Sequence, residues 1–350
     1  MPIIPVIIEQ HAENAAFNRL LRDKAVSDPH YDIDDLILLD DRIEANIDGL
    51  RIAGGQGWEI CQEAMEIGEP GEIFTAGVLA FESMIPERMD ALLAAVEKEK
   101  ELQRALVSAL GWIDFDWVAE PARKLLDAEL PFLRLIGLST YAVHRQDPGP
   151  MLAKLISDED PAVRVRALKA VGELGRSDLL LPTLNHLTDG DDKSKFFAAR
   201  SAAMLGVTSG VSALQAIAET ESPYSKQACP LAVRKMIPRD ATIWLKKFRN
   251  VPAKMSSSIA GFGALGDPAA IPWLLEQMQL PELTRPAGEA FSMITGVDLA
   301  YEDLEGEWPD GFEAGPTENP DDEDVAMDPD EDLPWPNPQL IQEWWQKNKS

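Results

Sequence analysis

Apolar side chains in the middle of the chain recur at the spacing of an amphipathic helix, and glycine or proline interrupts the pattern at intervals. Between residues 163 and 174 the positions that share one helical face are Val163, Ala167, Ala170, Val171 and Leu174. Gly175 follows this run, where a helix end favours a residue that tolerates the left-handed conformation. Pro182 lies at the start of the next apolar run, where its missing N–H costs nothing. The pattern predicts two short helices joined by a tight turn.

The same unit recurs with a period near 30 residues. The glycines that close each copy are spaced by 31, 60 and 30 residues: Gly175, Gly206, Gly266 and Gly296. Met236 occupies the midpoint of the longest step, and Arg145 and Gly111 continue the series towards the N-terminus at steps of 30 and 34. A fixed period of about 30 residues with two helical patterns in each copy is typical of an α-solenoid. We therefore predict an all-α fold, an α-solenoid of short repeats.

The repeat resembles the short HEAT repeat, whose copies carry an Asp-Pro turn, a basic residue on the inner helix and a closing Leu-Gly. One copy matches at Asp160-Pro161, Arg164 and Leu174-Gly175, and a later copy matches at Leu265-Gly266-Asp267-Pro268. The resemblance implies an α-solenoid and is nearly silent on function, because a fold class does not define an activity.

Residues 1–68 do not keep the period, and we expect them to cap one open end of the solenoid. Residues 1–8 are expected to form an extended apolar strap. Helices are expected at 9–26 and 32–52, with Asp32 or Asp34 as the N-cap of the second. The repeat body is expected to cover residues 69–297.

The composition changes abruptly after Val297. No Lys or Arg occurs between Arg285 and Lys347, an interval that holds 18 acidic residues, and repeated prolines prevent long helices there. Residues 298–350 are therefore expected to be extended or disordered alone, apart from a short Trp-rich final helix docked on the solenoid or on a partner. The candidate partner-binding residues are Asp321, Asp322, Glu323, Asp324, Asp328, Asp330, Trp335, Trp344 and Trp345. The tryptophans fit a binding hot spot, and a C-terminal cap is the alternative.

The charge narrows the choice of partner. The formal net charge is −28 at pH 7, which argues against nucleic acid and against an anionic membrane surface, and favours a partner with a basic surface. No run of apolar residues is long enough to span a membrane, and the N-terminus lacks the basic region of a signal peptide. Cys61 and Cys229 form no metal or redox motif, so we expect two reduced thiols and a cytoplasmic protein.

The sequence contains only weak matches to catalytic, cofactor-binding or metal-binding motifs. The glycines of G-x-G-x-x-G at 261–266 fall at the end of a repeat helix, at the phased Leu-Gly-Asp-Pro position, so we interpret them as part of the repeat and not as a dinucleotide site. The four histidines have no catalytic or metal-binding spacing, and His30, beside Tyr31 and Asp32, is the one polar cluster that merits inspection. Arg285 and Glu289 are interpreted as an exposed pair on one helix.

Three aspartates near the C-terminus have the alternating spacing of a calcium loop, at positions 328, 330 and 332. Leu333 stands where an EF-hand requires glycine, and Gln339 stands where it requires glutamate, so an EF-hand is excluded. A weak, nonspecific site for a divalent ion around 321–332 stays open.

The whole chain also resembles an uncharacterised bacterial family of HEAT-repeat proteins. The motifs that carry this resemblance are H-A-E-N-A-A-F (11–17), A-V-S-D-P-H-Y (25–31), L-D-D-R-I-E-A-N-I-D-G-L-R-I-A-G (39–54), G-W-E-I (57–60), A-L-G-W (109–112), L-G-D-P-A-A-I-P-W-L (265–274), A-G-E-A-F-S-M-I-T-G-V-D-L (287–299), D-L-P-W-P (332–336) and W-W (344–345). Genes of that family tend to lie in type VI secretion gene clusters, beside spike proteins and effector-loading factors. The family has no established activity, so no catalytic residue follows from it. Its members usually continue past W-W with a Gly-rich close, whereas this chain stops at Ser350.

These observations favour a non-catalytic scaffold or adaptor that binds another protein and carries neither a cofactor nor a bound metal. The family resemblance implies an accessory or chaperone-like role in type VI secretion, with a spike, effector or loading protein as partner. Two alternatives remain: a metal-dependent enzyme that uses acidic residues near His30 or the C-terminal segment, and a structural subunit that self-assembles.

Overall fold

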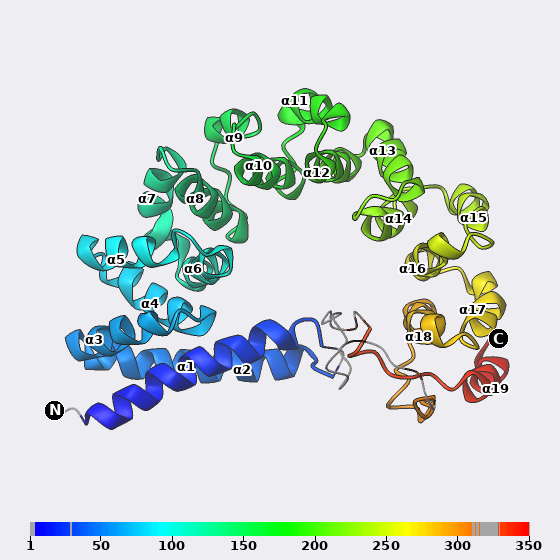
Figure 1. The fold of residues 1–350 in the computed structure, drawn as a ribbon, viewed down its shortest axis with the longest axis horizontal. Coiled ribbons are helices and arrows are strands. Elements are labelled where there is room, and N and C mark those ends of the chain that lie inside the picture. The colour runs from blue at the N-terminus through cyan, green and yellow to red at the C-terminus, as the bar shows by residue number, and fades with distance from the viewer. Residues whose placement is uncertain are drawn as a thin grey trace, which may run out of the picture. The chain divides into compact units, whose positions relative to one another are not determined.

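The chain is all-α and is described by a computed structural model, which covers residues 4–28, 30–309, 312, 315, 328 and 330–349. Over these residues it forms α-helices and short 3₁₀ helices and no β-strand, only an isolated bridge between Glu305 and Pro336. The chain divides into two compact units, residues 1–179 and residues 180–350 (Figure 1). Consecutive helices pack in series within each unit, so the prediction of an all-α solenoid is confirmed. The division at residues 68 and 297 stays a prediction.

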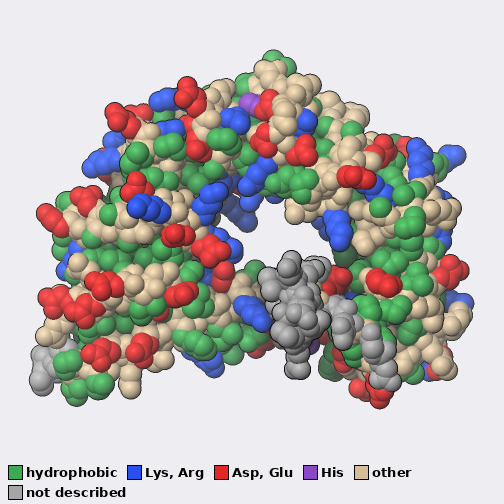
Figure 2. Space-filling model, viewed as in Figure 1, with side chains coloured by type: hydrophobic (Ala, Val, Ile, Leu, Met, Phe, Trp, Pro, Cys, Tyr) green, Lys and Arg blue, Asp and Glu red, His purple; other side chains and the backbone are tan. Residues whose placement is uncertain are grey.

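Unit 1 contains ten α-helices within its described residues, and one layer of them packs in the order α1, α4, α6, α8, α10. Their bounds are α1 Pro5–Ala25, α2 Ile33–Ala53, α3 Gly55–Ala64, α4 Pro70–Ser83, α5 Pro86–Val96, α6 Lys100–Trp112, α7 Phe115–Leu126, α8 Pro131–Val143, α9 Pro150–Leu155 and α10 Pro161–Glu173, with 3₁₀ turns at Met65–Ile67 and Ser177–Leu179. Figure 2 shows acidic side chains at the rim of this unit and hydrophobic side chains between its helices.

Unit 2 continues the arrangement over its own described residues, with α12, α14, α16 and α18 packed in order. The bounds are α11 Leu180–Asn185, α12 Asp192–Met204, α13 Thr208–Glu219, α14 Ser225–Val233, α15 Pro238–Lys246, α16 Met255–Leu265, α17 Ile271–Gln277, α18 Pro281–Thr295 and α19 Pro338–Asn348, with 3₁₀ turns at His186–Thr188, Pro252–Lys254 and Pro268–Ala270.

The glycines that mark the period take up the predicted left-handed turns. Their φ angles are +67° at Gly175, +83° at Gly206, +71° at Gly266 and +76° at Gly296. Arg145 occupies the same phase and also has a positive φ of +54°, without the freedom of glycine. Gly111 differs, because it lies inside α6, where an added Cβ would sit 2.5 Å from Cγ2 of Val143. It marks a close helix contact and not a turn.

The predicted N-terminal strap is wrong, because α1 already begins at Pro5. Proline is well tolerated at the first helical position, since that residue needs no backbone donor, and Ile8 is buried in the core of unit 1. The predicted second helix is present as α2, and its N-cap is Asp32. The Asp32 carboxylate accepts hydrogen bonds from the Asp34 and Asp35 amides (2.8 and 3.0 Å), and Asp35 accepts one from the Asp32 amide (3.2 Å).

Candidate functional site: the base of the acidic segment

The acidic segment that the sequence singles out is closed at its base by backbone pairing in unit 2. The amide of Gly306 donates to the Trp335 carbonyl (2.7 Å), and the amide of Asn337 donates to the Leu304 carbonyl (2.8 Å). These two bonds flank the antiparallel bridge between Glu305 and Pro336. Residues on both sides of the segment are thus held at one place on the unit. The sequence predicts a segment that is extended or disordered alone and ends in a docked helix, and it does not predict this pairing of the two sides of the segment.

Arg285 on α18 holds the C-terminal side of this base through hydrogen bonds to Asp328 and Asp330. Its side chain is only 4% exposed. Nη1 donates to the Asp330 carbonyl (2.7 Å), and Nη2 donates to Oδ2 of Asp328, whose side chain is 10% exposed. The interpretation of Arg285 as an exposed partner of Glu289 is therefore wrong: burial under the segment directs the guanidinium to Asp328 instead.

Two indole rings contact the same guanidinium. Arg285 Cζ lies 4.8 Å from the ring centroid of Trp308 and 5.3 Å from that of Trp335. The two rings are 4.8 Å apart, and the Trp308 indole N–H donates to the Phe312 carbonyl (2.7 Å). Cation–π contacts are worth about 0.5–1 kcal/mol at exposed sites and about 2 kcal/mol when desolvated. We call Arg285, Trp308, Asp328, Asp330 and Trp335 the arginine–tryptophan clamp.

The pKa values of the two clamp carboxylates are shifted in opposite directions. Burial alone would raise the pKa of Asp328, but hydrogen bonds from the Asp330 amide and from Arg285, and the charge of Arg285, lower it overall. Burial raises the pKa of Asp330, and the charges of Arg285 and Lys226 offset only part of this effect. Asp328 is therefore the carboxylate that neutralises Arg285.

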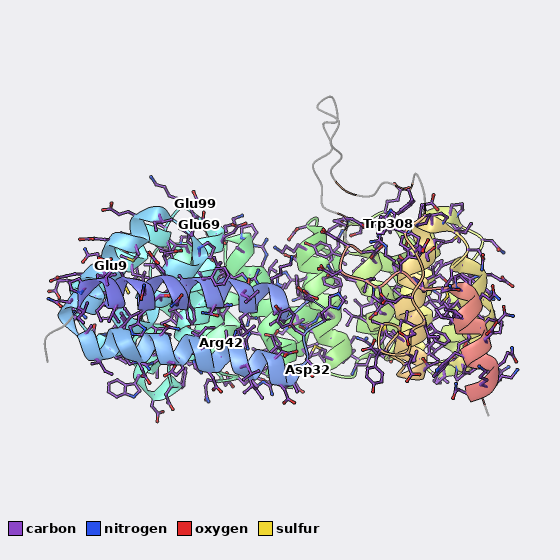
Figure 3. The ribbon with its side chains drawn as sticks, turned by 90° about the horizontal axis from the view of Figure 1, so that it is seen from below. Glu9, Asp32, Arg42, Glu69, Glu99 and Trp308 are labelled. Carbon is purple, nitrogen blue, oxygen red and sulfur yellow. The ribbon has the colours of Figure 1, made fainter. Side chains whose placement is uncertain are left out.

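The candidate tryptophans separate into different environments. Trp335 is half-buried in the clamp, and Trp344 and Trp345 on α19 make edge contacts with Phe291 at centroid distances of 5.8 and 6.5 Å. Ile341 on the same helix is fully buried, and α19 packs against α17. Trp308 is 49% exposed and was not a sequence candidate (Figure 3). Among these indoles it presents the surface most open to a partner.

The remaining candidates are the acidic residues Asp321, Asp322, Glu323 and Asp324, which lie outside the described residues. Neither Arg285 nor Trp308 stood out as a binding residue in the sequence. The available signal was the position of Arg285 as the last cation before the long interval without Lys or Arg. A solitary basic residue that faces an acidic segment is a natural partner for it.

The histidines are engaged in local structure. Three imidazoles have a partner of their own chain within hydrogen-bond distance: His11 with Asn46 (3.0 Å), His144 with the Leu110 carbonyl (2.8 Å) and His186 with Asp189 (2.6 Å). At the cluster of His30, Tyr31 and Asp32, the aspartate is occupied as the helix cap of α2. Over the described residues, no group of three or more His, Cys, Asp or Glu side chains is arranged to hold a metal ion.

The glycine motif at 261–266 lies at the end of the repeat helix α16, as predicted, and Gly266 is the C-cap of that helix. A Cβ on Gly261 would lie 2.5 Å from Cδ2 of Leu245, and a Cβ on Gly263 would lie 3.1 Å from Ala290, so both glycines allow α16 to pack closely on its neighbours. Cys61 and Cys229 are free and buried, and burial raises the pKa of each thiol to about 12. Thiols with such pKa values are unreactive near neutral pH.

Comparison with known proteins agrees with this architecture. A family model described as HEAT repeats matches residues 149–234. A crystal structure titled as an engineered protein of the Northeast Structural Genomics Consortium has 15% sequence identity and a TM-score of 0.37, and covers 82% of this chain and 94% of its own. A structural similarity this low carries no argument about fold or function. No curated protein matches the sequence.

The HEAT-repeat match and the serial packing of helices are typical of a protein-interaction scaffold. Among the described helices, none is both long and apolar enough to cross a membrane.

Proposed function

We propose that this chain is a non-catalytic adaptor that binds another protein, and that its acidic segment contacts a basic surface of that partner. The observation that carries the proposal is the arginine–tryptophan clamp, which holds the residues on both sides of the segment on unit 2. A segment fixed at both ends loses less conformational freedom on binding than a free tail does. Trp308, a half-exposed member of the clamp, supplies an aromatic contact of the kind found at binding hot spots.

The finer proposal is an accessory or chaperone-like role in a bacterial type VI secretion system, with a spike, effector or loading protein as partner. Its support is the run of family motifs along nearly the whole sequence. A cytoplasmic location belongs to the same proposal and is supported by the two unpaired thiols, since disulfides are rare in reducing compartments.

The test is affinity capture of the tagged full-length chain from its native host at low salt, followed by quantitative mass spectrometry. The informative variant replaces Asp321, Asp322, Glu323 and Asp324 with the matching amides. The control makes four Glu-to-Gln changes at exposed positions of unit 1, namely Glu59, Glu66, Glu87 and Glu97. Both variants lose four negative charges, so the overall charge is matched.

The proposal predicts a spike, effector or loading protein at near-equal amounts with wild type and with the control, and a strong loss with the segment variant. Equal recovery with both variants would assign the interaction to another surface. Recovery of no secretion component would remove the secretion role.

A further inference from the structure

A rigid network of ion pairs surrounds Arg51 in the last turn of α2. Nε and Nη2 donate to the two carboxylate oxygens of Glu82 (2.8 and 2.7 Å), and Nη1 donates to Glu44 (2.5 Å) and to Asp48 (2.6 Å). Glu44 also accepts a hydrogen bond from the Trp112 indole (2.6 Å). Three carboxylates thus surround one guanidinium, which leaves a surplus of two negative charges at fixed positions in unit 1.

Two hollows share the Arg51–Glu82 ion pair as a common wall. The first, of about 310 Å³, contains Trp58 and Arg88, and the Arg88 guanidinium lies 5.1 Å from the Trp58 ring centroid. The second, of about 370 Å³, is lined by Arg51, Glu82, Ile113, Asp114 and Trp117. Its rim is therefore acidic on one side and aromatic on the other.

The second hollow resembles the first in combining an acidic side chain with an indole, but within the described residues no arginine lies over its indole. Trp117 is 59% exposed, and no ring or cation–π contact from the described part of the chain covers it. Asp114 adds a further carboxylate, and its side chain already accepts the Asp116 amide as the N-cap of α7. An exposed indole beside fixed carboxylates binds cationic side chains through cation–π attraction and charge-assisted hydrogen bonds.

We propose that the hollow beside Trp117 binds an arginine or lysine side chain of a partner protein. The charged residues that line the hollow are Arg51, Glu82 and Asp114, and Glu44 and Asp48 lie next to it on the same guanidinium. The local charge is therefore negative, which favours a cationic occupant and disfavours an acidic one. This surface lies within unit 1 and does not depend on the acidic segment of unit 2.

The test uses the full chain labelled with 5-fluorotryptophan and two short peptides, acetyl-Leu-Arg-Leu-Arg-Leu-amide and its counterpart with Glu in place of Arg. Loss of one fluorine resonance in Trp117→Phe identifies the Trp117 signal. The Arg peptide should shift this signal at low ionic strength, salt should reverse the shift, and the Glu peptide should leave it in place. An unmoved Trp117 signal, or an equal shift with the Glu peptide, would overturn the proposal.

Variants then test the named side chains by the polarisation of a fluorescent Arg peptide. Trp117→Ala and Asp114→Asn should each weaken binding about two- to fivefold, as expected for partly exposed cation–π and ion-pair contacts. Asparagine keeps the helix cap of α7. The matched control is Asp160→Asn, which changes the N-cap of α10 in the same way and should bind as wild type does. Unchanged affinity in both test variants, with unchanged melting curves, would refute the assignment.

Discussion

Arg285 and Asp328 form a buried ion pair across 43 residues of sequence, with side chains that are 4% and 10% exposed. The pair joins a repeat helix of unit 2 to the segment that follows the repeats. Because both charges are largely removed from water, their interaction is coupled to the position of the segment far more strongly than a surface pair would be. The structure makes this pair the central element of the clamp.

Replacement of Arg285 with alanine should destabilise unit 2 by about 3–5 kcal/mol, because it leaves Asp328 buried without a counter-ion and removes the cation that contacts two indoles. Urea unfolding followed by tryptophan fluorescence measures this loss. Arg123→Ala is the control, since that exposed arginine pairs only with Glu120 on its own helix, and it should leave the unfolding midpoint nearly unchanged. Equal midpoints for the two variants would contradict the role of the clamp.

The contributions of Asp328 and Asp330 to the stability of the folded state should change with pH in opposite directions. The pKa of Asp328 is lowered by folding, so its contribution to stability is present at neutral pH and is lost as pH falls through its folded pKa. The pKa of Asp330 is raised by folding, so this group disfavours the folded state above that pKa and the penalty disappears in acid.

Urea unfolding between pH 3 and pH 7 measures both effects. Asp328→Asn should lower stability at pH 7 and flatten its loss in acid. Asp330→Asn, which keeps the carbonyl that accepts from Arg285, should leave stability at pH 7 unchanged or higher. Parallel pH profiles for wild type and Asp328→Asn would disprove the assignment.

The final helix should contribute to the stability of unit 2, whatever partner it meets. Ile341→Ala removes a fully buried side chain and should cost about 2–5 kcal/mol. Leu340→Ala is the neighbouring control, because Leu340 is 38% exposed and should cost much less. Chemical denaturation of both variants measures the two changes in the free energy of unfolding. A small and equal effect would mean that α19 is held by a partner and not by its own unit.

The repeat turns offer a paired test of the period. Gly206→Ala forces a side chain into a left-handed turn with φ of +83° and should destabilise the chain by about 1 kcal/mol. Arg145→Gly should have the opposite sign, because it relieves the positive φ at the equivalent phase of another copy. Thermal unfolding measures both changes. A loss of stability in Arg145→Gly would show that the Arg145 side chain contributes more than its backbone strain costs.

Local and periodic features of the fold could be predicted from the sequence. The glycine turns and the cap at Asp32 follow from rules that act over a few residues, and the solenoid class follows from their repetition. The predicted strap failed because Pro5 permits a helix to start as readily as it permits an extended chain.

The candidate site could be predicted from the sequence only in part. Acidic residues and tryptophans were selected by composition, but no periodic rule connects Arg285 with Asp328 or pairs Gly306 with Trp335. Such contacts depend on where the chain returns after a long excursion, which short-range patterns do not encode. For the same reason the surface around Trp117, which draws on three separate helices, α2, α4 and α7, was not predicted.

The most direct test of the clamp is amide hydrogen exchange of Gly306 and Asn337 in the full chain. Both amides donate across the base of the acidic segment, so the account predicts protection by about 10³-fold or more over an unstructured peptide, and loss of that protection in Arg285→Ala. Exchange of both amides in the wild type at the rate of an unstructured peptide would show that the segment is an open tail, and it would contradict the clamp.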